Sequence, residues 1–270
     1  MSKPGEFATH GQPSHTKART TADGMFQLRL VPGAERLAVA HADGWANVEL
    51  STLPGTPIWL QPWSRVEGVV RVGNRIWPKL KINVSTRNRI APPEQLLVDI
   101  YTYTDAEGRF EFPKVPSGQM EVVLIHEGER LGVFSHSQVI TVEPNATANV
   151  IVGGSGARVV GRVITHPDRS DIGWKRSTQH LQPKNRAPDS VISFDYGFFC
   201  QEDGSFTIHD VPPGEYTLSL QVCSRDDRAD SDLLEKTLGR TTRPVTIAAT
   251  LANRGELNLG IIEIKTQTAP

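Results

Sequence analysis

Residues 201–222, QEDGSFTIHDVPPGEYTLSLQV, contain two short segments in which apolar and polar side chains alternate. Phe206 and Ile208 are the apolar positions of the first segment, and every second residue from Tyr216 to Val222 is apolar in the other. A period of two is typical of a β-strand with one buried face. The stretch therefore predicts two half-buried strands, the second of them antiparallel to its neighbours.

Two turn signals bound the first of these strands. Asp203-Gly204 precedes it, and glycine adopts positive φ without a Cβ penalty while the Asp side chain can accept hydrogen bonds from turn amides. Pro212-Pro213-Gly214 follows it, where two prolines remove two backbone donors and stop strand pairing. The order of acidic turn, strand, Pro-Gly turn and strand predicts two reversals of chain direction.

The same order occurs in two earlier stretches, residues 104–128 and 21–44. Their turn residues are Asp105, Gly108 and Gly118 in the one, and Asp23, Gly24 and Gly33 in the other. The glycines closing the acidic turns, Gly24, Gly108 and Gly204, are 84 and 96 residues apart. That spacing exceeds a solenoid repeat and suits β-sandwiches of roughly 100 residues each.

The motif Asp-x-x-Gly-x-Phe-x-Phe/Ile followed by Val-Pro-x-Gly resembles the carboxypeptidase regulatory-like module. That module is a prealbumin-like (transthyretin-like) β-sandwich, similar to the Cna-B repeats of bacterial surface proteins and related to carbohydrate-binding-like folds. Its opening strand reads Val-x-Gly-x-Val, which residues 65–72 and 158–164 match. The resemblance covers about residues 20–265. It implies scaffolding or binding rather than turnover, with no catalytic residue and no cofactor to carry over.

We therefore expect an all-β chain of tandem Greek-key sandwiches, prealbumin-like or immunoglobulin-like, with little helix. Residues 1–61 are expected to form a polar tail and an incomplete module that lacks the Val-x-Gly-x-Val strand, and residues 62–152 a complete module. Residues 153–270 are expected to form a third module with a polar loop inserted at 166–190. That loop fits either a recognition surface or a disordered segment. Only residues 232–239 are expected to make a helical turn or two.

Composition and charge narrow the classes of partner. The chain has 270 residues, 38% of them hydrophobic, which suffices for two or three cores. Lys plus Arg is 29 against 30 for Asp plus Glu, so no overall field attracts nucleic acid or an acidic membrane surface. No apolar run approaches the roughly 18 residues needed to cross a bilayer. We expect a monomer or part of a longer polypeptide, with a protein or glycan partner.

The sequence leaves the compartment open. The N-terminus lacks the apolar core of a secretory signal. The resemblance implies a place outside the cytoplasm, in the bacterial cell envelope, and a segment upstream of Met1 could reconcile the two. Cys200 and Cys223 lie on either side of the repeated motif in the third module, where they fit a disulfide or two reduced, partly buried thiols.

Candidate chemistry is sparse. Ser155 lies in Gly-x-Ser-x-Ala, but a β-type segment follows instead of the helix that a nucleophile elbow needs, so a Gly-rich connection between modules is favoured. The eight histidines contain no pair three or four residues apart, and no Cys-x-x-Cys occurs, which disfavours zinc. The acidic run at residues 226–232 could ligate calcium, but a solvated loop is favoured over a metal site. Its carboxylates are Asp226, Asp227, Asp230 and Asp232.

The tryptophans offer the best ligand hypothesis, since sugar-binding surfaces use exposed aromatic rings as flat platforms. Trp59 and Trp63 straddle the first module boundary, where packing between sandwiches is favoured, and Trp174 is expected to be the exposed ring. Three functions follow from the sequence. The favoured one is a non-catalytic stalk or interaction scaffold. The alternatives are a carbohydrate- or peptide-binding module and a hydrolase fragment whose site joins distant segments.

Overall fold

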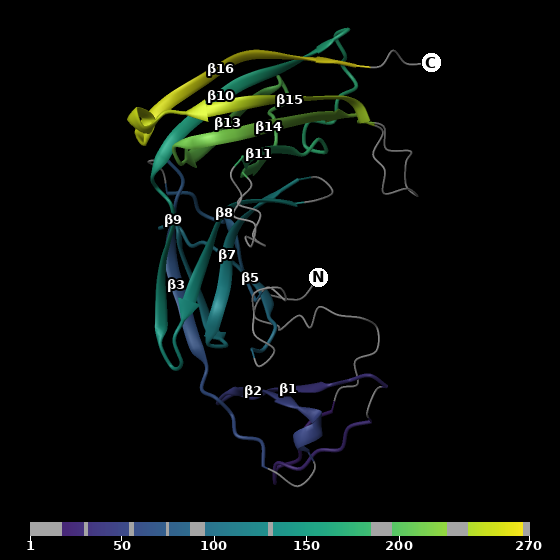
Figure 1. Cartoon of the computed structure of the whole chain (residues 1–270), viewed down its shortest axis with the longest axis vertical. Helices are drawn as coiled ribbons and strands as arrows, with labels where there is room; N and C mark the ends of the chain where they lie inside the picture. Colours follow the sequence, from purple (N-terminus) through teal and green to yellow (C-terminus); the bar gives the residue numbers. More distant parts are fainter. Residues whose placement is uncertain are drawn as a thin grey trace.

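The computed structural model describes residues 18–29, 32–53, 57–73, 76–86, 95–128, 132–184, 196–225 and 237–266. Its described elements are strands and two single turns of 3-10 helix, which confirms the predicted all-β class. Figure 1 shows them as three assemblies along the long axis: a hairpin of β1 and β2, a sandwich of β3 to β9, and a sandwich of β10 to β16. We call these the N-terminal hairpin, the second sandwich and the third sandwich.

The N-terminal hairpin comprises β1 (Arg36–Ala40) and β2 (Trp45–Glu49), followed by η1 (Leu50–Thr52). The second sandwich comprises β3 (Ser64–Arg71), β4 (Lys81–Ser85), β5 (Asp99–Tyr103), β6 (Arg109–Val115), β7 (Gly118–Glu127), β8 (Gly132–Val142) and β9 (Thr147–Gly153). The third comprises β10 (Gly156–His166), β11 (Gln179–Pro183), β12 (Tyr196–Phe198), β13 (Ser205–Val211), β14 (Gly214–Cys223), β15 (Thr237–Ile247), η2 (Ala249–Leu251) and β16 (Asn253–Lys265).

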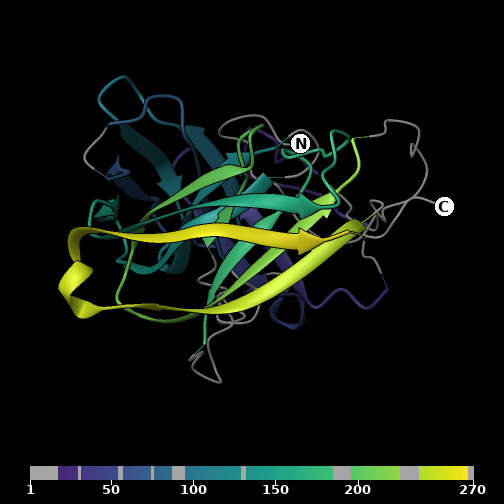
Figure 2. The ribbon, with the colours of Figure 1, turned by 90° about the horizontal axis from the view of Figure 1, so that it is seen from above.

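The two sandwiches have the same topology. Each pairs a three-stranded sheet, β6-β3-β9 or β13-β10-β16, with a four-stranded sheet, β5-β4-β7-β8 or β12-β11-β14-β15. The opening strand is central in the smaller sheet: β3 pairs antiparallel with β6 and parallel with β9, and β10 does the same with β13 and β16. Figure 2 shows β16 lying along β10 in the third sandwich.

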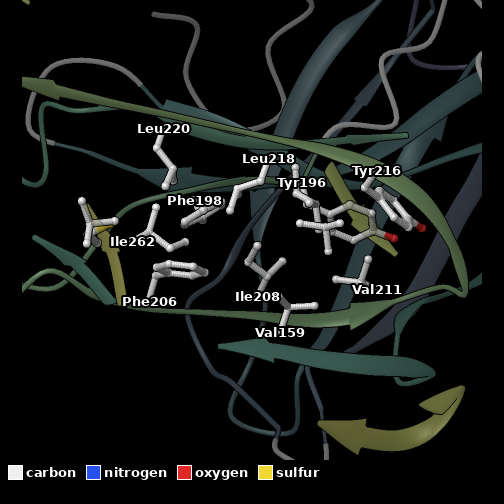
Figure 3. Packing of buried hydrophobic residues seen from close by; sticks show 14 of the residues in the cluster. Val159, Tyr196, Phe198, Phe206, Ile208, Val211, Tyr216, Leu218, Leu220 and Ile262 are labelled. Atoms are coloured by element: carbon white, nitrogen blue, oxygen red, sulfur yellow. The ribbon is translucent and has the colours of Figure 1, made fainter. Parts of the chain in front are cut away.

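Each sandwich has its own hydrophobic core, built from the alternating residues of both sheets. In the third sandwich Val159 and Ile208 of the smaller sheet face Leu218 and Leu220 of the larger (Figure 3). The Phe198 and Phe206 rings meet between the sheets with centroids 5.0 Å apart. In the second sandwich, Val66, Phe110 and Leu124 occupy the corresponding interior.

The two turn types occur where the motif predicts them, and both carry the chain from one sheet to the other. The acidic turn joins β5 to β6 and β12 to β13, and the Pro-Gly turn joins β6 to β7 and β13 to β14. Asp105 Oδ1 accepts hydrogen bonds from the amides of Glu107 and Arg109, at 3.0 and 2.8 Å, and Asp203 Oδ1 accepts one from Ser205. The turn residues are therefore reversals, although the strands they join do not pair with each other.

The first copy of the motif differs. The Asp23-Gly24 turn forms, with Gly24 at φ +81°, but no strand follows it among residues 25–29. The described sheet of this copy is the two-stranded hairpin, with one further bridge between Trp45 and Gln61. Trp45 is buried in the core of the second sandwich. The N-terminal hairpin therefore packs against its neighbour.

Two sequence expectations were wrong. The polar segment 166–190 is not a loop throughout, because β11 crosses it and Leu181 lies fully buried in the third core. The sequence of β11 does not alternate between apolar and polar residues, because the polar Gln179 also points inward. There its side-chain amide donates hydrogen bonds to the carbonyls of Ser177 and Gln221. The helical turns expected at 232–239 give way to strand β15 from Thr237, and residues 232–236 lie outside the described residues.

Candidate functional site: the junction of the second and third sandwiches

The connection between the two sandwiches is short and closely packed. β9 ends at Gly153 and β10 begins at Gly156, which leaves Gly154 and Ser155 between them. Gly153 has a φ of +74°, and a Cβ there would lie 2.4 Å from Arg71 O. Gly156 has a φ of +107°, and a Cβ there would lie 2.6 Å from the Asp210 carbonyl carbon. Ser155 is exposed and a strand follows it, so the nucleophile-elbow geometry is not formed.

Two β-bulges bring side chains from both sandwiches to this connection. The pairing of β7 with β8 shifts register beyond Val122, next to His136, and that of β10 with β13 shifts between Ala157 and Val159, opposite Asp210. His136 and Asp210 have φ of +53° and +56°, which are left-handed values rare for residues other than glycine. Bulges of this kind redirect side chains.

The contacts across the junction are buried and polar. Asp210 Oδ2 accepts a hydrogen bond of 2.8 Å from the Gly73 amide. His136 Nε2 lies 3.2 Å from His209 O and 4.0 Å from Asp210 Oδ2. The His136 ring also meets the Tyr196 ring edge to face, with centroids 5.3 Å apart. The backbone and side chains of both sandwiches therefore take part in one contact.

The hydrogen-bond partners determine where the protons lie. A carbonyl oxygen only accepts, so His136 Nε2 carries the proton that it donates to His209 O. In neutral His136, Nδ1 is then an acceptor, and the Ser135 hydroxyl donates a hydrogen bond of 2.8 Å to it. Ser135 Oγ in turn accepts from His126 Nε2 at 2.7 Å. A chain of three hydrogen bonds thus runs from β7 through β8 to β13.

The electrostatics favour this neutral arrangement. Burial, together with the smaller effect of the neighbouring His136 and His209, lowers the pKa of His126 to about 4. Burial also lowers the pKa of His136, although the Asp210 carboxylate partly opposes the shift. Burial raises the pKa of the Tyr196 hydroxyl well above its usual value. At neutral pH the two histidines are therefore uncharged.

This serine and its two histidines do not make a catalytic site. Ser135 is only 1% exposed, so no acyl donor can reach its oxygen. Asp210 lies too far from His136 for a hydrogen bond and instead binds the Gly73 amide. Within the described ranges no three His, Cys, Asp or Glu side chains gather as a metal site. The arrangement can fix two sandwiches together, which is a structural task.

A related contact joins the N-terminal hairpin to the second sandwich. The β3–β6 ladder shifts register opposite Arg65, at Pro113-Lys114, which corresponds to His209-Asp210 in the third sandwich. Lys114 Nζ donates to Ala42 O over 3.0 Å, and Trp63 Nε1 donates to His41 O over 2.8 Å. In both junctions, the residue before Val-Pro binds the preceding assembly.

The ligand candidates of the sequence lie elsewhere. Trp174 is partly buried and packs against the third core, where a Cβ on Gly204 would lie 3.3 Å from its ring, so the expectation of an exposed ring was wrong. Trp59 is the most exposed of the tryptophans in the described residues, and Trp63 packs partly against the second core. The four carboxylates of the acidic run lie outside the described residues.

The two cysteines are both buried and are not bonded to each other, so the disulfide is not formed in this structure. The Cys223 sulfur instead accepts a hydrogen bond of 3.0 Å from the side-chain amide of Gln221, and the Cys223 backbone N–H donates to Ser177 Oγ. Burial, together with the smaller effect of the Asp203 carboxylate, raises the pKa of the Cys200 thiol to about 12. Cys200 is therefore a protonated core residue at neutral pH.

The sequence did not reveal the junction residues. His126, Ser135 and His136 lie close together in the sequence, but at no spacing that suggests a shared site, and Asp210 lies in the other sandwich. One signal was available. Asp210 and Lys114 both directly precede the Val-Pro of the repeated motif, and a charged residue there marks the bulge that meets the preceding assembly.

No family model matches the chain. A mouse protein, BOS complex subunit NOMO1, is 28% identical over 148 residues, which are 53% of this chain and 11% of the mouse protein. The minor pilin GBS52 of Streptococcus agalactiae is similar at 11% identity and a TM-score of 0.30, over 77% of this chain and 98% of its own. The Bacillus anthracis TIE protein is similar at 12% identity and a TM-score of 0.26, over 95% of this chain and 50% of its own.

The sandwich topology and the repeated motif together support the resemblance to prealbumin-like modules. Because the match spans about a tenth of the mouse protein, its complex says nothing direct about this chain. Among the described residues no helix is long and apolar enough to cross a membrane.

Proposed function

We propose that the chain is a non-catalytic scaffold, a semi-rigid stalk in which consecutive β-sandwiches are held at fixed orientations. The observation that carries the proposal is the buried junction, in which Asp210 binds the Gly73 amide and His136 binds His209 O. Flexible linkers between domains are exposed and polar. Here the connection is only two residues long, and the glycines that flank it, Gly153 and Gly156, lie against neighbouring backbone.

The strained backbone at two junction residues is further support for a fixed junction. His136 and Asp210 each adopt left-handed φ, and such residues cost of order 1 to 3 kcal/mol apiece. Strain of this size persists only where the surroundings fix it. The bulges that carry these two residues face each other across the junction, and Gly197 of β12 approaches Phe134 O of β8 beside them.

The scaffold is favoured over the two alternatives of the sequence. A hydrolase needs an accessible nucleophile, and the buried Ser135 is not one. A carbohydrate site based on Trp174 needs a flat exposed ring, and that ring packs against the core. Fixed β-sandwiches instead suit a spacer that presents or binds another protein.

Distance measurements between the two sandwiches test the proposal. We choose spin labels at Thr141 of β8 and Thr246 of β15, both exposed, while the native thiols are buried. The unmodified junction should give one narrow distance distribution. Asp210→Ala should broaden it because the Gly73 amide loses its acceptor, whereas Asp210→Asn should keep it narrow, since asparagine retains an acceptor and tolerates left-handed φ.

The outcome is decisive in either direction. A broad distribution in the chain with native Asp210 means that the sandwiches move independently and the stalk proposal is wrong. Equal widths for the alanine and asparagine variants, both narrow, mean that the Asp210 contact does not fix the junction. Circular dichroism and thermal unfolding of each variant confirm that the sandwiches themselves stay folded.

A further inference from the structure

In both complete sandwiches a phenylalanine ring covers a glycine of the opening strand. Phe110 lies directly opposite Gly68 in the β3–β6 ladder, and Phe206 lies opposite Gly161 in the β10–β13 ladder. A Cβ on Gly68 would lie 2.7 Å from Phe110 Cζ, and a Cβ on Gly161 would lie 2.6 Å from Phe206 Cζ. Only glycine leaves room for the ring, which explains the middle residue of Val-x-Gly-x-Val.

Phe26 is the corresponding residue of the first copy. It follows Gly24 by two positions, as Phe110 follows Gly108 and Phe206 follows Gly204. Yet Phe26 is 41% exposed, whereas Phe110 and Phe206 are 4% and 3% exposed. Among the described residues, no strand pairs with the segment that carries Phe26 and places a glycine opposite it.

The turn before Phe26 is nevertheless formed. Gly24 N donates to Thr21 O over 2.9 Å, and Thr21 N donates to Met25 O over 2.8 Å. Residues 25–29 follow in neither strand nor helix, and Met25 is also exposed. The segment thus leaves its turn with an apolar side chain and backbone groups that a strand can pair.

We propose that residues 25–29 are the docking site for a β-strand of a partner protein, which pairs antiparallel to them and places a glycine under the Phe26 ring. The partner strand reads apolar-x-Gly-x-apolar, as β3 and β10 do. Those two strands cannot serve, because each is already paired on both sides in its own sheet. Addition of a strand to an exposed segment gives affinity through backbone hydrogen bonds and specificity through side-chain pockets.

A synthetic peptide with the sequence of residues 64–72, SRVEGVVRV, is the probe. Its matched control carries Gly68→Val, which keeps the strand propensity and fills the space that the ring needs. Hydrogen exchange of the full-length chain is followed with each peptide in excess. We expect amides within residues 25–29 to exchange about tenfold more slowly with the glycine peptide and unchanged with the control, a difference of about 1.4 kcal/mol.

A free peptide can fail to protect these amides only because it binds weakly, and a strand fused to the chain avoids this because its effective concentration is higher. The same nine residues are joined ahead of residue 18 through a flexible linker, once with glycine and once with valine at the central position. Protection of residues 25–29 by the glycine strand alone supports the proposal, as does its loss in Phe26→Ala. The proposal is overturned if neither peptide nor fusion protects them, or if the valine strand protects them equally. The junction measurement does not involve residues 25–29, so either proposal can fail alone.

Discussion

Gly204 illustrates how one backbone position fixes the acidic turn of the third sandwich. Its φ is +80°, and a Cβ there would lie 2.1 Å from Val163 O. We expect Gly204→Val to lower the free energy of unfolding by at least about 1 to 3 kcal/mol, from strain alone. Gly24 is the matched control, since its φ is +81° and nothing lies within 4 Å of its Cβ position. Urea unfolding compares the two, and equal losses would show that the contact with Val163 does not matter.

The cysteines give a second prediction for single residues. Because both thiols are buried and that of Cys200 has a pKa raised to about 12, neither should react with a thiol reagent in the folded protein. Alkylation in denaturant without reductant should add two groups, as intact mass will show. Two groups appearing only after reduction would instead establish the disulfide.

At the scale of elements, strands were predictable wherever one face is apolar and the other polar. The alternation from Tyr216 to Val222 gave β14, and the Val-x-Gly-x-Val segments gave β3 and β10. β11 was missed because its inward side chains include Gln179, whose burial depends on hydrogen bonds that the chain alone does not show. Phe26 has the same local pattern as Phe110 but forms no strand, since a strand also needs a partner.

The junction could not be predicted for a related reason. His136 and Asp210 meet because two bulges shift the register of separate sheets, and bulges leave no period in the sequence. Burial also changes what a serine next to histidines can do. Ser135 between two histidines resembles catalytic machinery by composition, and its burial makes it part of a hydrogen-bond chain.

For the whole molecule we predict a loss of stability in mild acid. The pKa of His126 falls from 6.5 to about 4 on folding, so the unfolded chain binds a proton that the folded one excludes. The stabilisation is complete above pH 6.5 and is lost as the pH falls toward 4, and this residue alone contributes about 3 kcal/mol. Chemical unfolding measured across this range is the test.

Substitutions assign that loss to its source. His126→Gln removes the titration of His126 while keeping a donor for Ser135, so the slope between pH 6.5 and 4 should become shallower, and the remaining slope belongs to His136, whose pKa burial also lowers. His41→Gln, at a histidine whose side chain is 55% exposed, is the matched control. The turn carboxylates Asp105 and Asp203 have lowered pKa values, through hydrogen bonds from Arg109 and Ser205 respectively. The stability that they contribute is therefore lost only below about pH 4, outside the range of this test. An unchanged slope in His126→Gln would contradict the assignment.

The parallel pairing of first and last strands has a mechanical consequence. β3 and β9 run in the same direction over seven paired residues, and β10 and β16 over nine. Tension along the polypeptide therefore enters each sandwich at one end and leaves at the other, and pulls the two strands past each other lengthwise. All hydrogen bonds of the ladder bear the load together, whereas strands peeled apart from one end break them singly. A chain built this way resists stretching, which is what a tether under pull requires.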